Sequence, residues 1–195
     1  VGAAATGSYI FNNTNVLNAY VHTDDAERRQ AEYEKRYRQY RDVPQPRVVS
    51  VRADVDIFPR ERRADIRGSY RLANRSAVPI STLHIGVPRR VQIRRLDLPP
   101  HRAVLEDRRL GYAIYELTTP LAPGQEITFG FHLEISNPGF VNNDPDNAVV
   151  ENGTFFHTRQ LPSLGYLDYR ELGDPSQRRR QGLPPLARMA RIDDR

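Results

Sequence analysis

The clearest pattern in the sequence is the alternation of apolar and polar residues between positions 126 and 136, which read EITFGFHLEIS. The apolar side chains occupy every second position: Ile127, Phe129, Phe131, Leu133 and Ile135. Successive side chains of a β-strand point to opposite faces, so this period predicts a strand with one buried face and one face in water. Burying the apolar face would contribute roughly 1.5–3 kcal/mol per side chain before the entropy cost of folding. Such a strand needs a second layer to cover it.

The same alternation recurs upstream in the chain. Residues 49–57 and 64–72 alternate apolar and polar side chains on either side of a turn at Pro59, which predicts a β-hairpin. Further strand patterns lie at 83–87, 91–98 and 112–117, with one more candidate at 149–158. Turn residues, not helical patterns, separate them. The sequence therefore predicts a mainly β fold, an antiparallel two-sheet sandwich domain at 46–160.

Parity along the strands predicts which side chains share the core of this sandwich, because residues of one parity lie on one face. We expect a single core, within about 48–136, formed by Val51, Val55, Ile57, Ile127, Phe129, Phe131 and Leu133. The intervening polar residues are expected to be exposed: Arg52, Asp54, Asp56 and Glu134.

Residues 23–45 have the pattern of a helix. Thr23, Asp24 and Asp25 suit a helix start, and two Glu/Arg pairs follow at a spacing of four residues. A narrow apolar stripe at helical spacing is formed by Ala26, Tyr33, Tyr37 and Tyr40. Two interpretations remain open: a surface helix that packs on its own domain through the tyrosines, or a coiled-coil or partner-binding helix.

The two ends of the chain lack strand patterns. Residues 1–22 are small, apolar and rich in Asn, and we expect them to be irregular. They have no basic region that would mark a signal peptide. Residues 161–195 read as a linker or tail, and we expect their last part, with Arg178, Arg179 and Arg180, to be a frayed and solvated basic segment. Contact of this tail with phosphate or lipid is the alternative.

Composition narrows the possible functions. The chain has no cysteine, which excludes structural disulfides, thiol catalysis and thiolate zinc sites. Its net charge of +5 comes almost wholly from Arg, but the basic residues are interleaved with 24 acidic ones. Because no basic face emerges, we expect no nucleic-acid binding. No run of 18 apolar residues is present, so the sequence predicts no transmembrane helix within these residues.

No combination of residues in the sequence forms a complete active site, and we expect no catalytic, cofactor-binding or metal-binding residue in this chain. The five histidines are His22, His84, His101, His132 and His157, and none belongs to an H-E-x-x-H zinc motif. His84 and His132 fall at polar strand positions, where a solvent-facing side chain is expected. A weak calcium-binding candidate is the loop with Asp144, Asp146 and Asn147, which lacks the Gly and bidentate Glu of a calcium loop.

Several motifs together resemble a known family. The stretches DVDIFP at 54–59, ERRADIRGSYRLAN at 61–74 and TPLAPGQEITFGF at 119–131 resemble the N-terminal β-domain of aminopeptidase N-like zinc metallopeptidases. The stretches YIFNNTNVLN, YEKRY, VENGTFF and LPSLGY resemble a bacterial subgroup in which an ABC-transporter-like permease is fused to an aminopeptidase-like half. The resemblance extends from about Tyr9 to Met189.

The resemblance implies a non-catalytic, extracytoplasmic domain of a bacterial membrane protein. In that family the zinc ion and the G-x-M-E-N and H-E-x-x-H motifs belong to a following domain, and neither motif occurs here. The implied partners are the parent protein's own catalytic domain and membrane region, with a peptide substrate as a further partner. Residues 1–22 would then lie next to the membrane, with the 23–43 helix as a spacer and 161–195 leading towards the catalytic domain.

Two other functions remain open at this point. The chain could be an accessory extracytoplasmic domain of a transporter without peptidase activity. It could also be a free-standing adhesion or carbohydrate-binding sandwich, although the absence of Trp counts against an aromatic binding platform. A downstream H-E-x-x-H motif in the parent gene would support the peptidase, and upstream membrane spans without it would support the transporter.

Overall fold

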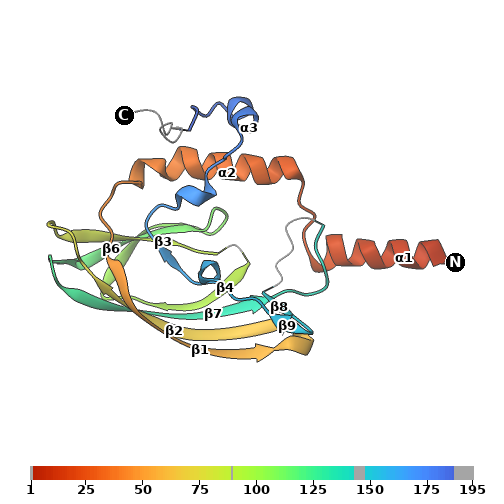
Figure 1. Cartoon of the computed structure of the whole chain (residues 1–195), viewed down its shortest axis with the longest axis horizontal. Coiled ribbons are helices and arrows are strands. Elements are labelled where there is room, and N and C mark those ends of the chain that lie inside the picture. Colours follow the sequence, from red (N-terminus) through yellow and green to blue (C-terminus); the bar gives the residue numbers. More distant parts are fainter. Residues whose placement is uncertain (1, 89, 143–147, 187–195) are drawn as a thin grey trace, which may run out of the picture.

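The structure, a computed structural model, describes residues 2–88, 90–142 and 148–186. Two four-stranded antiparallel sheets pack face to face, and a long helix covers the outer face of one of them (Figure 1). An N-terminal helix precedes the sandwich, and a largely irregular segment follows it. The predicted fold class, a mainly β two-sheet sandwich with an N-terminal helix and an irregular C-terminal segment, is confirmed.

The first sheet has the strand order β1-β2-β7-β4 and the second sheet the order β10-β3-β6-β5. The strands of the first sheet are β1 (Arg47–Phe58), β2 (Arg63–Ala73), β7 (Glu126–Ser136) and β4 (Val91–Asp97). Those of the second sheet are β10 (Ser163–Leu164), β3 (Ile80–Gly86), β6 (Tyr112–Leu121) and β5 (His101–Asp107). The predicted hairpin is present, because β1 pairs antiparallel with β2 around the turn after Phe58.

Two strand predictions need correction. β5 was not predicted, because its sequence HRAVLED carries only a weak alternation and every residue of it is at least partly exposed. The candidate strand at 149–158 is instead a minimal hairpin of β8 (Val149–Val150) and β9 (Gly153–Thr154). In both cases the strand is recognised by its hydrogen-bonded pairing with a neighbouring strand, because its sequence has no clear alternation of apolar and polar residues.

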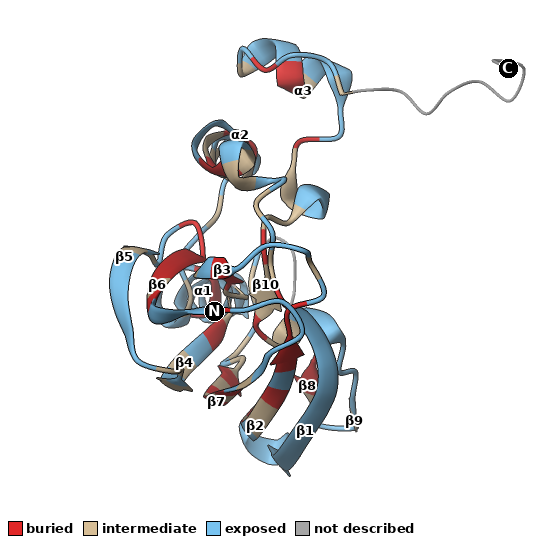
Figure 2. Cartoon of the chain, turned by 90° about the vertical axis from the view of Figure 1, so that its left-hand side faces the viewer, coloured by how far each residue is buried: buried red, intermediate tan, exposed pale blue. Residues whose placement is uncertain are grey.

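The core lies between the two sheets, with β7 at its centre. Phe129, Phe131 and Leu133 are buried as predicted, and Ile127 is half-buried. The prediction that β1 contributes to this core is wrong: Val51, Val55 and Ile57 are 54%, 41% and 40% exposed. β1 is the outermost strand of the first sheet, and all its residues are exposed because no second layer covers it (Figure 2). Its polar residues Arg52, Asp54 and Asp56 are exposed as predicted, whereas Glu134 on β7 is half-buried.

The predicted helix at 23–45 is present as α2 (Thr23–Tyr37), extended by the 3₁₀ turn η2 (Arg38–Tyr40). Its tyrosine stripe packs on the outer face of the second sheet. The rings of Tyr33 and Tyr37 lie 5.8 Å and 4.4 Å from the ring of Tyr112 on β6, and all three side chains are buried. The interpretation as a surface helix on its own domain is confirmed, and α2 forms a third layer of the fold.

The segment after the sandwich folds back along α2 and ends in the short helix α3 (Pro175–Arg180), with the 3₁₀ turns η4 (Thr158–Gln160) and η5 (Asp168–Arg170) before it. Arg178 is 1% exposed and donates two hydrogen bonds to the buried carboxylate of Glu34, at 2.7 and 2.8 Å. The same guanidinium also donates to the backbone carbonyls of Leu172 and Pro184. The prediction that Arg178 belongs to a solvated tail is therefore wrong. Residues 187–195 lie outside the described part.

The N-terminal residues are helical, which corrects the expectation of an irregular segment at 1–22. α1 (Gly2–Phe11) continues into a π-helical turn, η1 (Asn12–Leu17), and no residue of α1 is buried. Together they project beyond the sandwich, with the N-terminus at the far end (Figure 1). Asn18 anchors the base of this projection by donating hydrogen bonds to the carbonyls of Pro138 and Phe140. Within the described residues, no helix combines the length and the apolar character needed to cross a membrane.

Candidate functional site: a cleft between two strand edges

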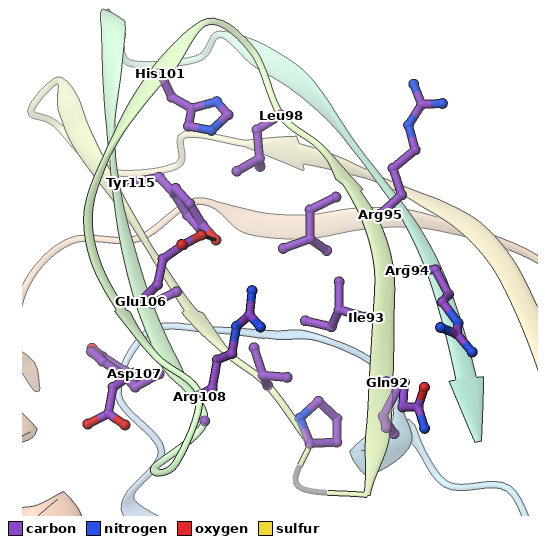
Figure 3. Close-up of a pocket in the computed structure, with 17 residues that line it drawn as sticks. Gln92, Ile93, Arg94, Arg95, Leu98, His101, Glu106, Asp107, Arg108 and Tyr115 are labelled. Atoms are coloured by element: carbon purple, nitrogen blue, oxygen red, sulfur yellow. Dashed lines mark hydrogen bonds between the residues drawn. The ribbon is translucent and has the colours of Figure 1, made fainter. Parts of the chain in front are cut away.

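A cleft of about 560 Å³ opens where the two sheets do not meet, between β4 and β5. β4 is the last strand of the first sheet and β5 the last strand of the second, so both border the cleft with an edge that has no neighbouring strand in its sheet. Figure 3 shows the two strands as its opposite walls, with side chains directed into the space between them.

The floor of the cleft is an opening into the hydrophobic core. Its apolar residues are Val91, Ile93, Leu96 and Leu98 from β4 and the turn after it, and Ala113 and Tyr115 from β6. All of them belong to the core cluster between the sheets or pack against it. Apolar side chains of a ligand would therefore contact the same surface that stabilises the fold, a usual property of small-molecule and peptide sites.

The rim of the cleft is charged. Arg94 pairs with Glu134 at 2.8 Å and Arg95 pairs with Asp97 at 2.6 Å, so both guanidinium groups are neutralised within the first sheet. Arg108 points into the cleft from the end of β5 (Figure 3). Its guanidinium can pair with an anionic group at the mouth, because its planar fork of N–H donors fits carboxylate and phosphate oxygens.

Tyr115 contributes a hydrogen-bond donor whose direction is fixed. Its hydroxyl donates to Glu106 at 2.8 Å, and its ring packs edge-on against the imidazole of His101 with the centroids 5.1 Å apart. Burial, and then the nearby Glu106 carboxylate, raise the pKa of Tyr115 to about 12. The phenol therefore stays protonated and acts as a donor, not as a base.

This arrangement favours recognition over covalent chemistry. An apolar floor with the Arg108 guanidinium at its mouth can hold an extended segment with aliphatic side chains and a nearby acidic group. The sequence analysis did not predict the cleft. Its floor residues are ordinary inward-facing strand residues, and the opening arises because β4 and β5 do not pair with one another.

Among the histidines, His84 differs most from the sequence prediction. It was expected to face solvent from a polar strand position, but it is 3% exposed, because Tyr40 of η2, the turn that extends α2, packs on this face of β3. Its two ring nitrogens lie 2.9 Å from the hydroxyl of Tyr112 and 3.2 Å from that of Thr82. Burial lowers the pKa of His84 to about 4, so the ring is neutral at physiological pH.

The remaining histidines are not gathered in one place. His132 is half-buried on β7 and lies 2.9 Å from a carboxylate oxygen of Asp65 on β2, while His22, His101 and His157 are exposed. In the described ranges, no group of three or more His, Asp or Glu residues is arranged to hold a metal ion. The calcium candidate with Asp144, Asp146 and Asn147 falls outside those ranges.

A second surface with functional character is the projecting N-terminal helix. Residues 1–21 contain no Asp, Glu, Lys or Arg. Large apolar side chains are exposed along α1 and η1, with Tyr9 at 63%, Phe11 at 61% and Val16 at 66%. A water-facing helix of a soluble domain normally carries charged side chains on its exposed face, and α1 has none.

Comparison with known proteins gives no matching family model and no matching curated protein for this chain.

Proposed function

We propose that this chain is a non-catalytic, extracytoplasmic β-sandwich domain of a membrane-anchored, aminopeptidase-like and ABC-permease-like bacterial protein, and that it packs on a following zinc peptidase domain. The fold agrees with the sandwich that the family resemblance implies. The observation that carries the proposal is the uncharged, apolar α1 projecting from the sandwich. The family motifs quoted above supply the peptidase part.

The geometry of the projection suits attachment to a membrane surface. The ten residues of α1 span about 15 Å at 1.5 Å per residue, half of the roughly 30 Å hydrocarbon thickness, so these residues can enter one leaflet. Its exposed aromatic residues Tyr9 and Phe11 have the character of interface anchors. The first strongly charged residues, Asp24 and Asp25, occur only in α2, which packs on the sandwich and would stay in water.

The membrane contact can be tested by fluorescence, because the chain contains no Trp. The substitution Phe11→Trp places a single indole on the exposed face of α1. We expect its emission to shift to shorter wavelength when phosphatidylcholine vesicles are added, since the indole moves from water into the interface. As a matched control, Val78→Trp, at a position 48% exposed between β2 and β3, should show no shift.

An unchanged emission of the Phe11→Trp variant, or an equal shift for both variants, would contradict the membrane contact. Protease accessibility of the domain in intact cells then tests the side of the membrane on which it lies. Protection of the domain inside the cell would contradict the extracytoplasmic placement.

The peptidase part of the proposal concerns the parent protein. We expect the isolated chain neither to bind stoichiometric zinc nor to hydrolyse aminoacyl-chromogenic substrates, whereas the parent should do both, because the zinc ligands belong to its following domain. A parent gene without a downstream H-E-x-x-H motif would favour the alternative, an accessory domain of a transporter.

The cleft favours a second candidate function, that of a peptide-binding sandwich. An extended peptide with alternating Leu and Asp could place its aliphatic side chains on Leu96 and Leu98 and one carboxylate on Arg108. Titration of the labelled domain with such a capped peptide should shift NMR signals from β4, β5 and β6. A peptide with Lys in place of Asp serves as the control, and equal shifts from both peptides, or none, would exclude charge-directed binding here.

A further inference from the structure

The outer edge of β1 is the longest exposed strand edge in the described part of the molecule. β1 runs over 12 residues and pairs with β2 on one side only. Its other side therefore presents a row of backbone N–H and C=O groups without a strand neighbour. The strand forms the lowest border of the sandwich in Figure 1, away from α2, and none of its residues lines the cleft.

The other edge strands of the two sheets carry features that discourage pairing with another chain. The register of β4 shifts between Ile93 and Arg95, and that of β5 shifts between Ala103 and Leu105. Such irregularities twist a strand edge away from a flat partner, and β10, with two residues, is too short to be a template. β1 has one such shift as well, between Val48 and Ser50, but beyond it β1 pairs regularly from Ser50 to Phe58.

The surface of β1 also differs between its two faces. Val51, Val55 and Ile57 stand opposite Tyr70, Ile66 and Ala64 of β2, so they extend the core-facing side of the sheet but remain exposed. The other face is charged and contains Arg52, Asp54 and Asp56. A long, regular and half-apolar edge of this kind is a predicted association site.

The sequence of β1 identifies the partner, because it is complementary to itself. In an antiparallel pair centred on Ala53, Arg52 stands opposite Asp54 of the second copy, and Asp54 stands opposite Arg52 of the second copy. On the apolar face, Val51 stands opposite Val55 of the second copy. Oppositely charged and β-branched cross-strand pairs both stabilise a sheet.

Neighbouring registers are less complementary. A shift that centres the pair on Arg52 or on Asp54 places that residue opposite itself, so that like charges meet at the two-fold axis, although the register centred on Asp54 also places Arg52 opposite Asp56. The charges are also available for pairing: Arg52 and Asp54 are 81% and 74% exposed, and within one chain they approach only to 3.8 Å. In this arrangement Arg52 of each copy contacts Asp54 of the other copy. Such reciprocal contacts are the signature of a two-fold interface.

We propose that a second copy of this chain pairs antiparallel with the free edge of β1, around a two-fold axis at Ala53. The two first sheets then join into one continuous sheet across the dimer. The charge pairs between Arg52 and Asp54 select the register, and the apolar faces of the two β1 strands lie side by side. This inference rests on β1 alone and does not depend on the proposed function.

A charge-swap experiment tests both the edge and the register. Arg52→Asp and Asp54→Arg each place like charges opposite one another in a homodimer. We expect each single variant to be monomeric in sedimentation velocity at concentrations where the wild-type chain is dimeric. Mixed one to one, the two variants should form a heterodimer, because the introduced charge at 52 then faces the introduced opposite charge at 54.

The double variant Arg52→Asp/Asp54→Arg restores both pairs with reversed polarity and should dimerise like the wild type. Arg102→Asp, at an exposed position on β5, is the control for a general charge effect and should leave association unchanged. Because positions 52 and 54 are exposed, circular dichroism should show that all variants fold. A wild-type chain that stays monomeric, single variants that dimerise normally, or a mixture that does not associate would each overturn the proposal.

Discussion

The two sheets of the sandwich have the same number of strands and the same antiparallel pairing, but they differ in how many of their faces are covered. In the second sheet, β6 is buried on both faces: Ala113 and Tyr115 face the first sheet, and Tyr112 and Ile114 face α2. The first sheet is covered on one face only, and its outer strand β1 on neither. Alternation along a strand thus shows which side chains share one face of the sheet. Whether those side chains are buried depends on the layers that pack on that face.

The largest effect is expected at the centre of the covered region. Phe129 on β7 is 0% exposed, and its ring packs against that of Tyr70 with the centroids 5.7 Å apart. Phe129→Ala should lower the free energy of unfolding by about 3–5 kcal/mol, because it leaves a cavity between the sheets. Urea denaturation measures this loss. Phe155→Ala, at a position 63% exposed, is the control and should change stability by no more than about 0.5 kcal/mol.

The next largest effect is expected from the doubly covered face of the second sheet, as a dependence on pH. The folded state lowers the pKa of His84 to about 4 from an ordinary value of 6.5. Below pH 6.5 the unfolded chain therefore binds a proton that the folded chain does not bind. The contribution of neutral His84 to the free energy of unfolding is therefore fully present above pH 6.5. Below this pH the free energy of unfolding falls by about 1.4 kcal/mol per pH unit as the pH drops towards 4, roughly 3 kcal/mol in total.

The free energy of unfolding, measured by urea denaturation between about pH 7 and pH 5, checks this slope. In this window the carboxylates with a lowered pKa, such as Asp65 and Asp107, keep their contribution, since their ordinary pKa is 3.8. His84→Asn removes the titrating group, and its stability should be nearly independent of pH in the window. An equal slope in the variant and the wild type would show that His84 is not the cause.

These cases show where sequence reasoning succeeds and where it fails. The alternation at 126–136 predicted the buried parity of β7 correctly, because a central strand has neighbours on both sides and a sheet above it. The same alternation in β1 predicted burial that does not occur, since nothing in a local pattern tells an edge from a centre. His84 was missed for the converse reason: the contact that buries it comes from Tyr40 of η2, about forty residues away in sequence.

The cleft follows the same logic. The sequence predicted β4 and missed β5. An opening between these two strands, however, depends on which strands end the two sheets. The buried pair of Glu34 and Arg178 is separated by 144 residues, so the basic run at 178–180 gave no local signal that one of its members is fully enclosed. Long-range pairing is the information that the patterns lack.

A smaller effect is expected where the covered and uncovered parts of the first sheet meet. Gly68 on β2 stands opposite Ala53 of β1, and a Cβ atom there would lie 2.5 Å from the ring of Phe131 and 2.7 Å from the backbone oxygen of Arg52. Gly68→Ala should therefore lower the free energy of unfolding by about 1–3 kcal/mol, because neither the buried ring nor the backbone can move freely. Gly173→Ala, with no atom close to the added carbon, serves as the control in the same urea titrations. A neutral result at Gly68 would mean that β1 shifts easily relative to β2.

The smallest effect is expected on β1 itself, where the comparison between the two regions is sharpest. Val55 and Ile66 stand directly opposite one another on the same face, yet Val55 is 41% exposed and Ile66 is 2% exposed. Val55→Thr keeps the β-branched shape and should change the free energy of unfolding by no more than about 0.5 kcal/mol when the protein is dilute. Ile66→Thr should cost several times more, because it buries a hydroxyl group in the core. If Val55→Thr destabilises the dilute chain as strongly as Ile66→Thr, the apolar face of β1 is covered within one molecule. If Val55→Thr destabilises the protein only at high protein concentration, a second copy of the chain contacts the apolar face of β1.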